Sequence, residues 1–224
     1  MNSNSTTTIS KSEALQQTIN WDYFRGDLIL VRQIFFQAGF NCFQIGPDFD
    51  PDQFGGKAHA YFGVRVDYVE GEVNMQLNLL IIPGEQDTDT HESPYIYCAP
   101  FLAGNLEAMH NTTPSENQQQ LIAMEERWAN EGEDWLETVV GTDDGMTQVS
   151  DVPLQDISTE FDFENNLYVY FGLHNHEIPH KELALLFYDG NSGHFLDLEG
   201  ADFTTPKPPF GTDKADYSLV YDIP

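Results

Sequence analysis

The stretch that decides the fold is AHAYFGVRVDYVEGEVNMQLNLLII, residues 58–82. Two runs rich in β-branched and aromatic residues flank Glu70-Gly71, a dipeptide typical of a tight turn. Pro83 and Gly84 follow directly and indicate where the second run ends. The pattern predicts a β-hairpin with its strands at 58–69 and 73–82.

A second stretch of the same character, NLYVYFGLHNHEIPHKELALLFYDG, covers residues 166–190 and predicts another hairpin, and GHFLDLEG (193–200) adds a third strand. Both units contain the triplet YFG, and LNLLIIPG at 77–84 is similar to LALLFYDG at 183–190, at a shift of about 106 to 109 residues. Two matches of this length also arise by chance among aromatic-rich strands. The sequence therefore leaves open whether the chain is an internal duplication.

Helical patterns precede both predicted hairpins. Ser10 with Glu13 fits a capping box, in which each residue satisfies a backbone N–H of the other. The stretch 22–38 places Leu28, Val31 and Phe35 on one face, with Gly39 at the position of a C-terminal cap. A third helix is predicted to begin at Ser115, with Gln118 as its capping partner, and its apolar face comprises Leu121, Met124, Trp128, Trp135 and Val139.

These elements predict an α+β protein in which antiparallel β-hairpins form one sheet or two similar sheets, with the helices packed on one face. A loop is expected at 41–57 and a short buried strand in YIYCAPFL, residues 95–102. The expected divisions are a disordered leader (1–11), a module of helix, hairpin and helix (12–140), an acidic connection (141–158), a second β unit (159–205) and an extended tail (206–224) that ends in a strand. A single compact domain over 12–224 is the alternative.

The charge is strongly unbalanced, because nine Lys and Arg stand against 37 Asp and Glu, a net charge of −28. Residues 1–40 sum to zero, so the whole excess lies beyond them. Such a surface repels nucleic-acid phosphates and anionic membranes and attracts basic partners. No apolar run reaches the length of a membrane helix, the first residues do not follow the pattern of a secretory signal, and two cysteines make no disulfide framework. We expect a cytoplasmic protein.

The acidic residues of the third predicted helix are the expected partner-binding residues, namely Glu125, Glu126, Glu133 and Asp134. The favoured function is a non-enzymatic acidic binding protein that covers a basic partner, such as an inhibitor, an immunity protein or a mimic of nucleic acid. One alternative is a structural or self-assembling protein, bridged by cations or forming a homo-oligomer through the N-terminal helix. Another is a metal-dependent enzyme that uses the histidine cluster at 174–180.

The sequence offers two weak metal candidates. His174 and His176 alternate on one strand face, and either His180 or Glu177 could close a site from the turn, since catalytic zinc uses three such ligands. Pro179 and the match of this segment with Arg65 and Asp67 of the first hairpin favour an ordinary hairpin tip instead. Asp48, Asp50 and Asp52 alternate as in an EF-hand loop, but the required glycine and glutamate are absent. We therefore predict no metal, no cofactor and no catalytic residue.

Overall fold

The computed structural model describes residues 7–36, 39, 41–49, 56–88, 94–102, 114–142, 146–152, 167–174, 182–196, 205–207 and 217–221. Its helices are α1 (Lys11–Phe24), α2 (Leu28–Phe35), the 3-10 turn η2 (Gly84–Gln86), α3 (Glu116–Val139) and the single turn α5 (Ser218–Tyr221). Its strands are β1 (Thr7–Thr8), β2 (Cys42–Ile45), β3 (Ala58–Val69), β4 (Glu72–Pro83), β5 (Tyr97–Leu102), β6 (Val149–Val152), β7 (Leu167–Leu173), β8 (Leu183–Asp189), β9 (His194–Phe195) and β10 (Thr205–Lys207). Among these residues, no helix is long and apolar enough to cross a membrane.

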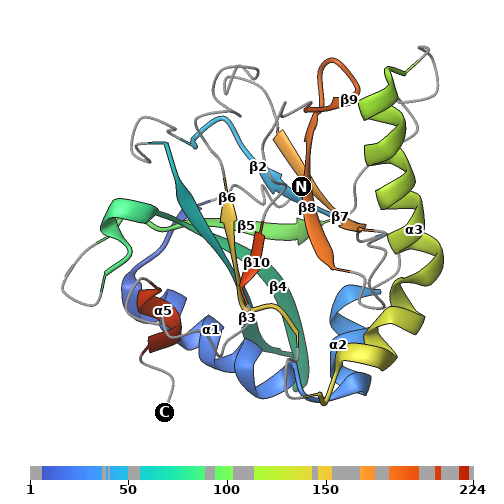
Figure 1. Ribbon diagram of the computed structural model, residues 1–224. Coiled ribbons are helices and arrows are strands. Elements are labelled where there is room, and N and C mark those ends of the chain that lie inside the picture. Colours follow the sequence, from blue (N-terminus) through green and yellow to red (C-terminus); the bar gives the residue numbers. More distant parts are fainter. Residues whose placement is uncertain are drawn as a thin grey trace.

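The described strands form one antiparallel sheet in the order β10-β6-β3-β4-β5-β2-β7-β8-β9, with β1 paired to β5. Strand β10 also contacts β8, so the sheet curls round toward itself (Figure 1). The predicted class, α+β with antiparallel hairpins, is confirmed, and the hairpins lie in one sheet. The turn between β3 and β4 has positive φ at Glu70 (54°) and Gly71 (89°), the backbone that suits a two-residue hairpin.

Each of the two hairpins pairs with a short strand that lies next to the other hairpin in the sequence. Strand β2 precedes the first hairpin but pairs with β7 of the second, where Cys42 lies opposite Tyr170. Strand β6 precedes the second hairpin but pairs with β3 of the first, where Val149 lies opposite Tyr61. The single sheet is therefore held together by pairings between the N-terminal and C-terminal halves of the chain.

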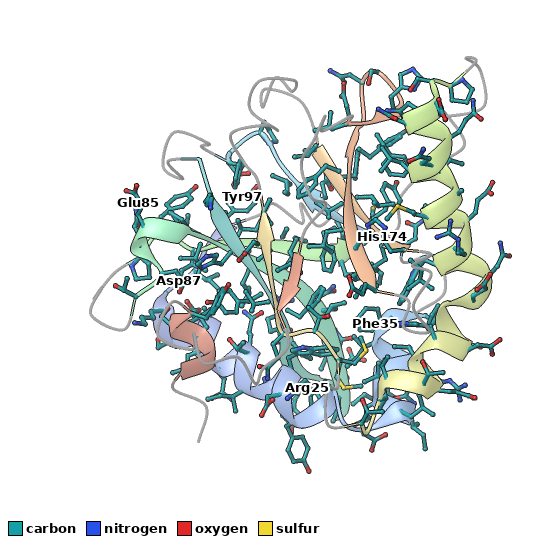
Figure 2. The ribbon with its side chains drawn as sticks, in the orientation of Figure 1. Arg25, Phe35, Glu85, Asp87, Tyr97 and His174 are labelled. Atoms are coloured by element: carbon teal, nitrogen blue, oxygen red, sulfur yellow. The ribbon has the colours of Figure 1, made fainter. Side chains whose placement is uncertain are left out.

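The inner side of the curled sheet holds one large hydrophobic cluster. Alternate residues of a strand point to the same face, so Ala58, Ala60, Phe62 and Val64 of β3 all enter this cluster. Phe35 of α2 belongs to this cluster, is 1% exposed and lies beside α3 (Figure 2). Its ring centroid is 5.8 Å from Trp21, 6.4 Å from Phe62, 5.7 Å from Trp128 and 5.0 Å from Phe171. These aromatic contacts join both halves into a single core.

The longer helices contribute to clusters on both sides of the sheet, because Trp21 of α1 and Trp128 of α3 belong to the inner cluster. Ala14 of α1 lies in a cluster with Tyr61 of β3, and Leu121 of α3 lies in a separate cluster with Tyr170 of β7. Helix α2 contributes Phe35 to the inner cluster as well. The helices are therefore distributed over the sheet, which does not confirm the prediction that they all pack on one face.

Local capping explains where the helices begin. Ser10 Oγ accepts from Glu13 N at 3.3 Å and Ser10 N donates to the Glu13 carboxylate at 2.9 Å, so the predicted capping box is confirmed. Ser115 Oγ accepts from Gln118 N at 3.2 Å at the start of α3. The helix predicted at 22–38 is interrupted, because Asp27 caps a new helix by accepting from Ile29 N and Leu30 N.

Four segments differ from the sequence predictions. Strand β1 lies in the predicted leader (1–11), β2 in the predicted loop (41–57) and β6 in the predicted connection (141–158). These strands have two to four residues, too few to carry a periodic pattern, and distant strands supply their hydrogen bonds. The tail (206–224) contains the helical turn α5 where a strand was expected, because burial of Leu219 and hydrogen bonds to Asp87 hold that turn on the sheet.

Candidate functional site

Only His174 of the predicted histidine cluster lies among the described residues. Its backbone N donates to Glu182 O at 2.9 Å and so continues the β7–β8 hairpin by one more bond. Figure 2 shows His174 at the end of that hairpin. His176 and His180 lie outside the described residues. In the described part of the chain, no group of three or more His, Cys, Asp and Glu side chains is arranged to hold a metal. The absence of metal from the hairpin tip stays a prediction.

Of the predicted aspartate triplet, only Asp48 is described. Its carboxylate accepts from the hydroxyl of Tyr97 at 3.0 Å. The same hydroxyl accepts from Gly46 N at 2.9 Å, and Tyr97 is fully buried on β5 (Figure 2). Asp48 thus fastens the segment after β2 to the sheet. Asp50 and Asp52 lie outside the described residues.

All four predicted partner-binding residues lie on α3. Glu126, Glu133 and Asp134 are exposed, and Glu125 is half-buried. The helix carries seven carboxylates and one cation, a net charge of −6. At about 1.5 Å of rise per residue, Glu126, Glu133 and Glu137 follow one side of the helix over roughly 16 Å.

The single cation of α3 is directed toward the sheet. The guanidinium of Arg127 donates to the carbonyl of Leu173 at the end of β7. A second cation, Arg32 of α2, lies 2.5 Å from Glu137 near the C-terminal end of the helix. The three exposed carboxylates Glu126, Glu133 and Asp134 have no such ion pair within the described residues. The outward side of α3 is therefore an acidic surface.

Glu125 differs from the other three. Burial raises the pKa of its carboxyl to about 7, and the neighbouring charge of Glu126 adds to the shift. Near neutral pH this side chain is close to half protonated, so it contributes less fixed charge than the exposed residues of the same helix.

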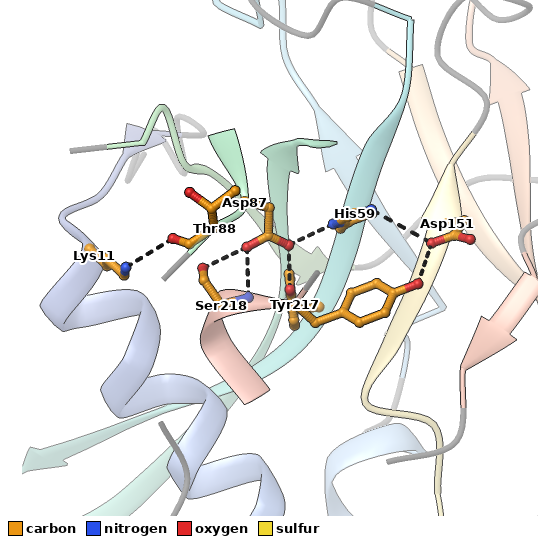
Figure 3. A network of polar contacts seen from close by, with 8 residues as sticks. Lys11, His59, Asp87, Thr88, Asp151, Tyr217 and Ser218 are labelled. Atoms are coloured by element: carbon orange, nitrogen blue, oxygen red, sulfur yellow. Dashed lines mark hydrogen bonds and ion pairs between the residues drawn. The ribbon is translucent and has the colours of Figure 1, made fainter. Parts of the chain in front are cut away.

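The structure also contains a buried polar cluster that the sequence did not indicate (Figure 3). The Asp87 carboxylate is fully buried and accepts four hydrogen bonds. One oxygen accepts from the backbone N of Ser218 at 3.0 Å and from its hydroxyl at 2.6 Å. The other oxygen accepts from His59 Nδ1 at 2.6 Å and from the Tyr61 hydroxyl. Burial and the adjacent Asp87 charge raise the pKa of Tyr61 well above its usual value, so this hydroxyl keeps its proton.

A buried aspartate that orients a histidine is also a feature of general-base catalysis. In those sites the second ring nitrogen faces the reacting group. Here His59 Nε2 lies 3.8 Å from Asp151, whose carboxylate accepts from the Tyr217 hydroxyl at 3.0 Å, and the His59 side chain is only 14% exposed. The arrangement is suited to fasten α5 to β3 and β6. It was missed because its members are dispersed along the sequence, with Asp87 inside an acidic run and Ser218 in the predicted tail.

Neither cysteine is placed as a nucleophile. Cys42 and Cys98 are free thiols and are buried. Burial raises the pKa of Cys42 to about 12 and that of Cys98 to about 11. The thiolate is the reactive form, so both side chains are inert near neutral pH.

Comparisons of this chain with protein-family models, with curated proteins and with solved structures found no match. The features of the chain that bear on function are therefore the acidic surface of α3 and the Asp87 cluster.

Proposed function

We propose that the protein is a non-enzymatic acidic binding protein whose α3 surface covers a basic site on a partner protein. The observation that supports this is the exposed row of carboxylates on α3, whose single cation, Arg127, is directed toward the sheet. A surface of one sign attracts and orients an oppositely charged partner, mainly by raising the association rate. An inhibitor, an immunity protein and a mimic of nucleic acid all use this chemistry.

The state of the nucleophile and base candidates also favours binding over catalysis. Among the described residues, His59 faces a carboxylate at each ring nitrogen, and both thiols stay protonated near neutral pH. A metal-dependent enzyme would depend on the segment around His176 and His180, because no group of three or more potential ligands occurs among the described residues themselves. The free thiols suit the reducing conditions of the cytoplasm, which we propose as the compartment.

The test is affinity capture with the full chain from its host cells, followed by measurement of binding kinetics with the captured protein. The partner should be basic, and the association rate should fall steeply as salt rises. Neutralising Glu126, Glu133 and Asp134 to the corresponding amides should slow association by about tenfold while changing dissociation little.

A matched control removes three exposed charges elsewhere, through Glu70→Gln, Glu72→Gln and Glu85→Gln. The control should change association far less than the α3 variant. A captured partner that is acidic, binding that is insensitive to salt, or equal effects of the two triple variants would each refute the proposal.

For the fold, we propose that the chain is an internal duplication of a unit made of a helix, a short strand and a hairpin. The supporting observation is that the hairpins share one register. Tyr61 pairs with Leu80 in the first YFG unit, and Tyr170 pairs with Leu186 in the second. The exchanged strands share it too, since Tyr61 also pairs with Val149 of β6, and Tyr170 with Cys42 of β2.

The helices match in the same way. A Cβ on Gly63 would meet Gln17 of α1, and a Cβ on Gly172 would meet Met124 of α3. Trp21 of α1 lies 5.8 Å from Phe62, and Trp128 of α3 lies 5.1 Å from Phe171, measured between ring centroids. Both contacts involve the middle residue of a YFG triplet, which supports a common origin of the two units.

The proposed units have diverged on the side of the sheet that carries Tyr61 and Tyr170. The Tyr61 hydroxyl donates to Asp87. The matching Tyr170 hydroxyl is buried beside the Cys42 thiol and has no carboxylate partner in the described part of the chain. The Asp87 cluster that fastens α5 therefore lies beside Tyr61 and is not repeated beside Tyr170 among the described residues.

A further inference from the structure

Five large apolar side chains in the described part of the chain are strongly exposed, and all five lie at one end of the molecule. They are Tyr23 (79%), Ile29 (69%), Tyr68 (78%), Val69 (56%) and Val73 (57%). The first two flank the junction of α1 and α2, and the others surround the tip of the β3–β4 hairpin. These elements meet at the lower edge of Figure 1, where the Asn20 side chain donates to Val64 O at 2.8 Å and α2 contacts β4. We call this region the neutral end, for its charge.

The tip of the first hairpin extends beyond the hydrophobic core, because Tyr68 and Val73 near the turn are exposed. In the described residues, pairing of β7 with β8 reaches Leu173 and Leu183, with one further bond from His174 N to Glu182 O, whereas pairing of β3 with β4 continues to Val69 and Glu72. Strand alternation places Tyr68 and Val73, which are paired with each other, on the face that lines the core deeper in the hairpin. Burial within one chain therefore does not account for these two apolar side chains.

The charge of this region distinguishes it from the rest of the surface. Residues 20–36 carry two carboxylates and two guanidinium groups and sum to zero, and residues 64–75 sum to −2, in a chain of −28. A basic partner is drawn to the acidic surfaces. A second copy of this chain is repelled by those surfaces and meets the least repulsion here. The chemistry thus favours a second copy as the occupant.

We propose that the neutral end is a self-association surface on which two copies of the chain dock with two-fold symmetry, so that Tyr68 and Val73 of one copy face the same residues of the other. A fully buried aromatic side chain covers about 150–250 Å², so Tyr23 and Tyr68 together offer about 300 Å² per copy. The largest apolar patch on a typical monomeric protein is about 300–600 Å² and is often functional. The interface is small, so the dimer is weak and forms only at high concentration. It leaves α3 free for a basic partner.

The test is sedimentation equilibrium of the full chain over concentrations from micromolar to about 200 μM. A dimer should form, and its dissociation constant should decrease as salt rises, because salt screens the repulsion between two chains of −28. The opposite salt dependence is expected for binding of a basic partner, so failure of this proposal is distinguishable from failure of the proposed function.

Substituting both Tyr68→Ser and Val73→Thr should weaken the dimer at least about tenfold, because an isologous contact loses each side chain twice. The matched control is Asn74→Ser, at an exposed residue on the opposite face of the same hairpin and outside the five apolar side chains, which should keep the dimer. Thermal unfolding of both variants should match the parent, since all three positions are exposed. A chain that stays monomeric throughout, or a dimer unchanged by the double substitution, would overturn the proposal.

Discussion

Replacing Gly172 with alanine should separate α3 from the sheet. A Cβ built on Gly172 would lie 2.7 Å from Leu186 Cδ1 and 3.1 Å from Met124 Cβ. The leucine methyl group could turn aside, but Met124 Cβ is attached to the helix backbone and moves only if α3 moves. Inserting one methyl group into such a contact costs about 1–3 kcal/mol. We expect the free energy of unfolding of Gly172→Ala to fall by that amount.

Gly63→Ala should destabilise the protein by a similar amount, because a Cβ on Gly63 would lie 2.8 Å from Leu80 Cδ1 and 2.9 Å from Gln17 Cβ of α1. Urea unfolding followed by circular dichroism measures both variants. Gly26→Ala is the matched control, because a Cβ there has no atom within 4 Å, and it should leave stability within about 1 kcal/mol. A loss below about 0.5 kcal/mol in Gly63→Ala and Gly172→Ala would refute the close approach of the helices.

Further predictions concern single side chains. Phe35→Ala should lower the free energy of unfolding by about 3–5 kcal/mol in urea titrations, because it empties the centre of the core; an unchanged melting temperature with a changed mass would indicate a subunit contact instead. The folded-state pKa of Glu125, about 7 against an ordinary 4.5, means that the folded state binds the proton more tightly, so stability should fall as pH rises from about 4.5 to about 7. Glu125→Gln should remove this fall, which is on the order of 1 kcal/mol after allowance for partial exposure, and equal pH profiles would contradict the assignment. Cys42 and Cys98 should resist alkylation at pH 7.5 until the protein unfolds, as mass spectrometry would show. Asp87→Asn should speed hydrogen exchange in residues 217–221 and leave β7 protected, because it disrupts the hydrogen bonds that hold α5.

The elements with strong local signals were predictable from sequence. The first hairpin lies where its β-rich runs and the Glu70-Gly71 turn placed it, and Ser10 begins α1 as its capping partner indicated. The buried face of α1 was not predictable from its apolar residues. Leu15 and Ile19 are only partly buried, whereas Gln17 and Thr18 are buried. Helix α1 approaches Gly63 closely at Gln17, where there is no room for a larger side chain on the strand. This contact with the strand decides which face of α1 is buried.

The candidate site shows the same division. The acidic residues of α3 were found because one helix holds them all, and helical periodicity places Glu126 and Glu133 on one side. The Asp87 cluster joins β3, the segment after η2 and α5, and its hydrogen bonds connect residues that are remote in sequence. Only the fold brings such groups together, so no local pattern could have indicated it.

The exchange of β2 and β6 between the halves has a consequence for how the chain folds during synthesis. The first hairpin leaves the ribosome long before β6 exists to pair with β3, and β2 waits longer still for β7. Pairings between segments so distant in sequence close large loops, which slows folding and makes it a single late event. A fragment that contains only one hairpin keeps an unpaired strand edge, and the short strand from the other fragment would pair with that edge. If the chain is cut between α3 and β6, the two fragments should therefore bind each other and rebuild the sheet. The N-terminal fragment supplies β2 to β7, and the C-terminal fragment supplies β6 to β3.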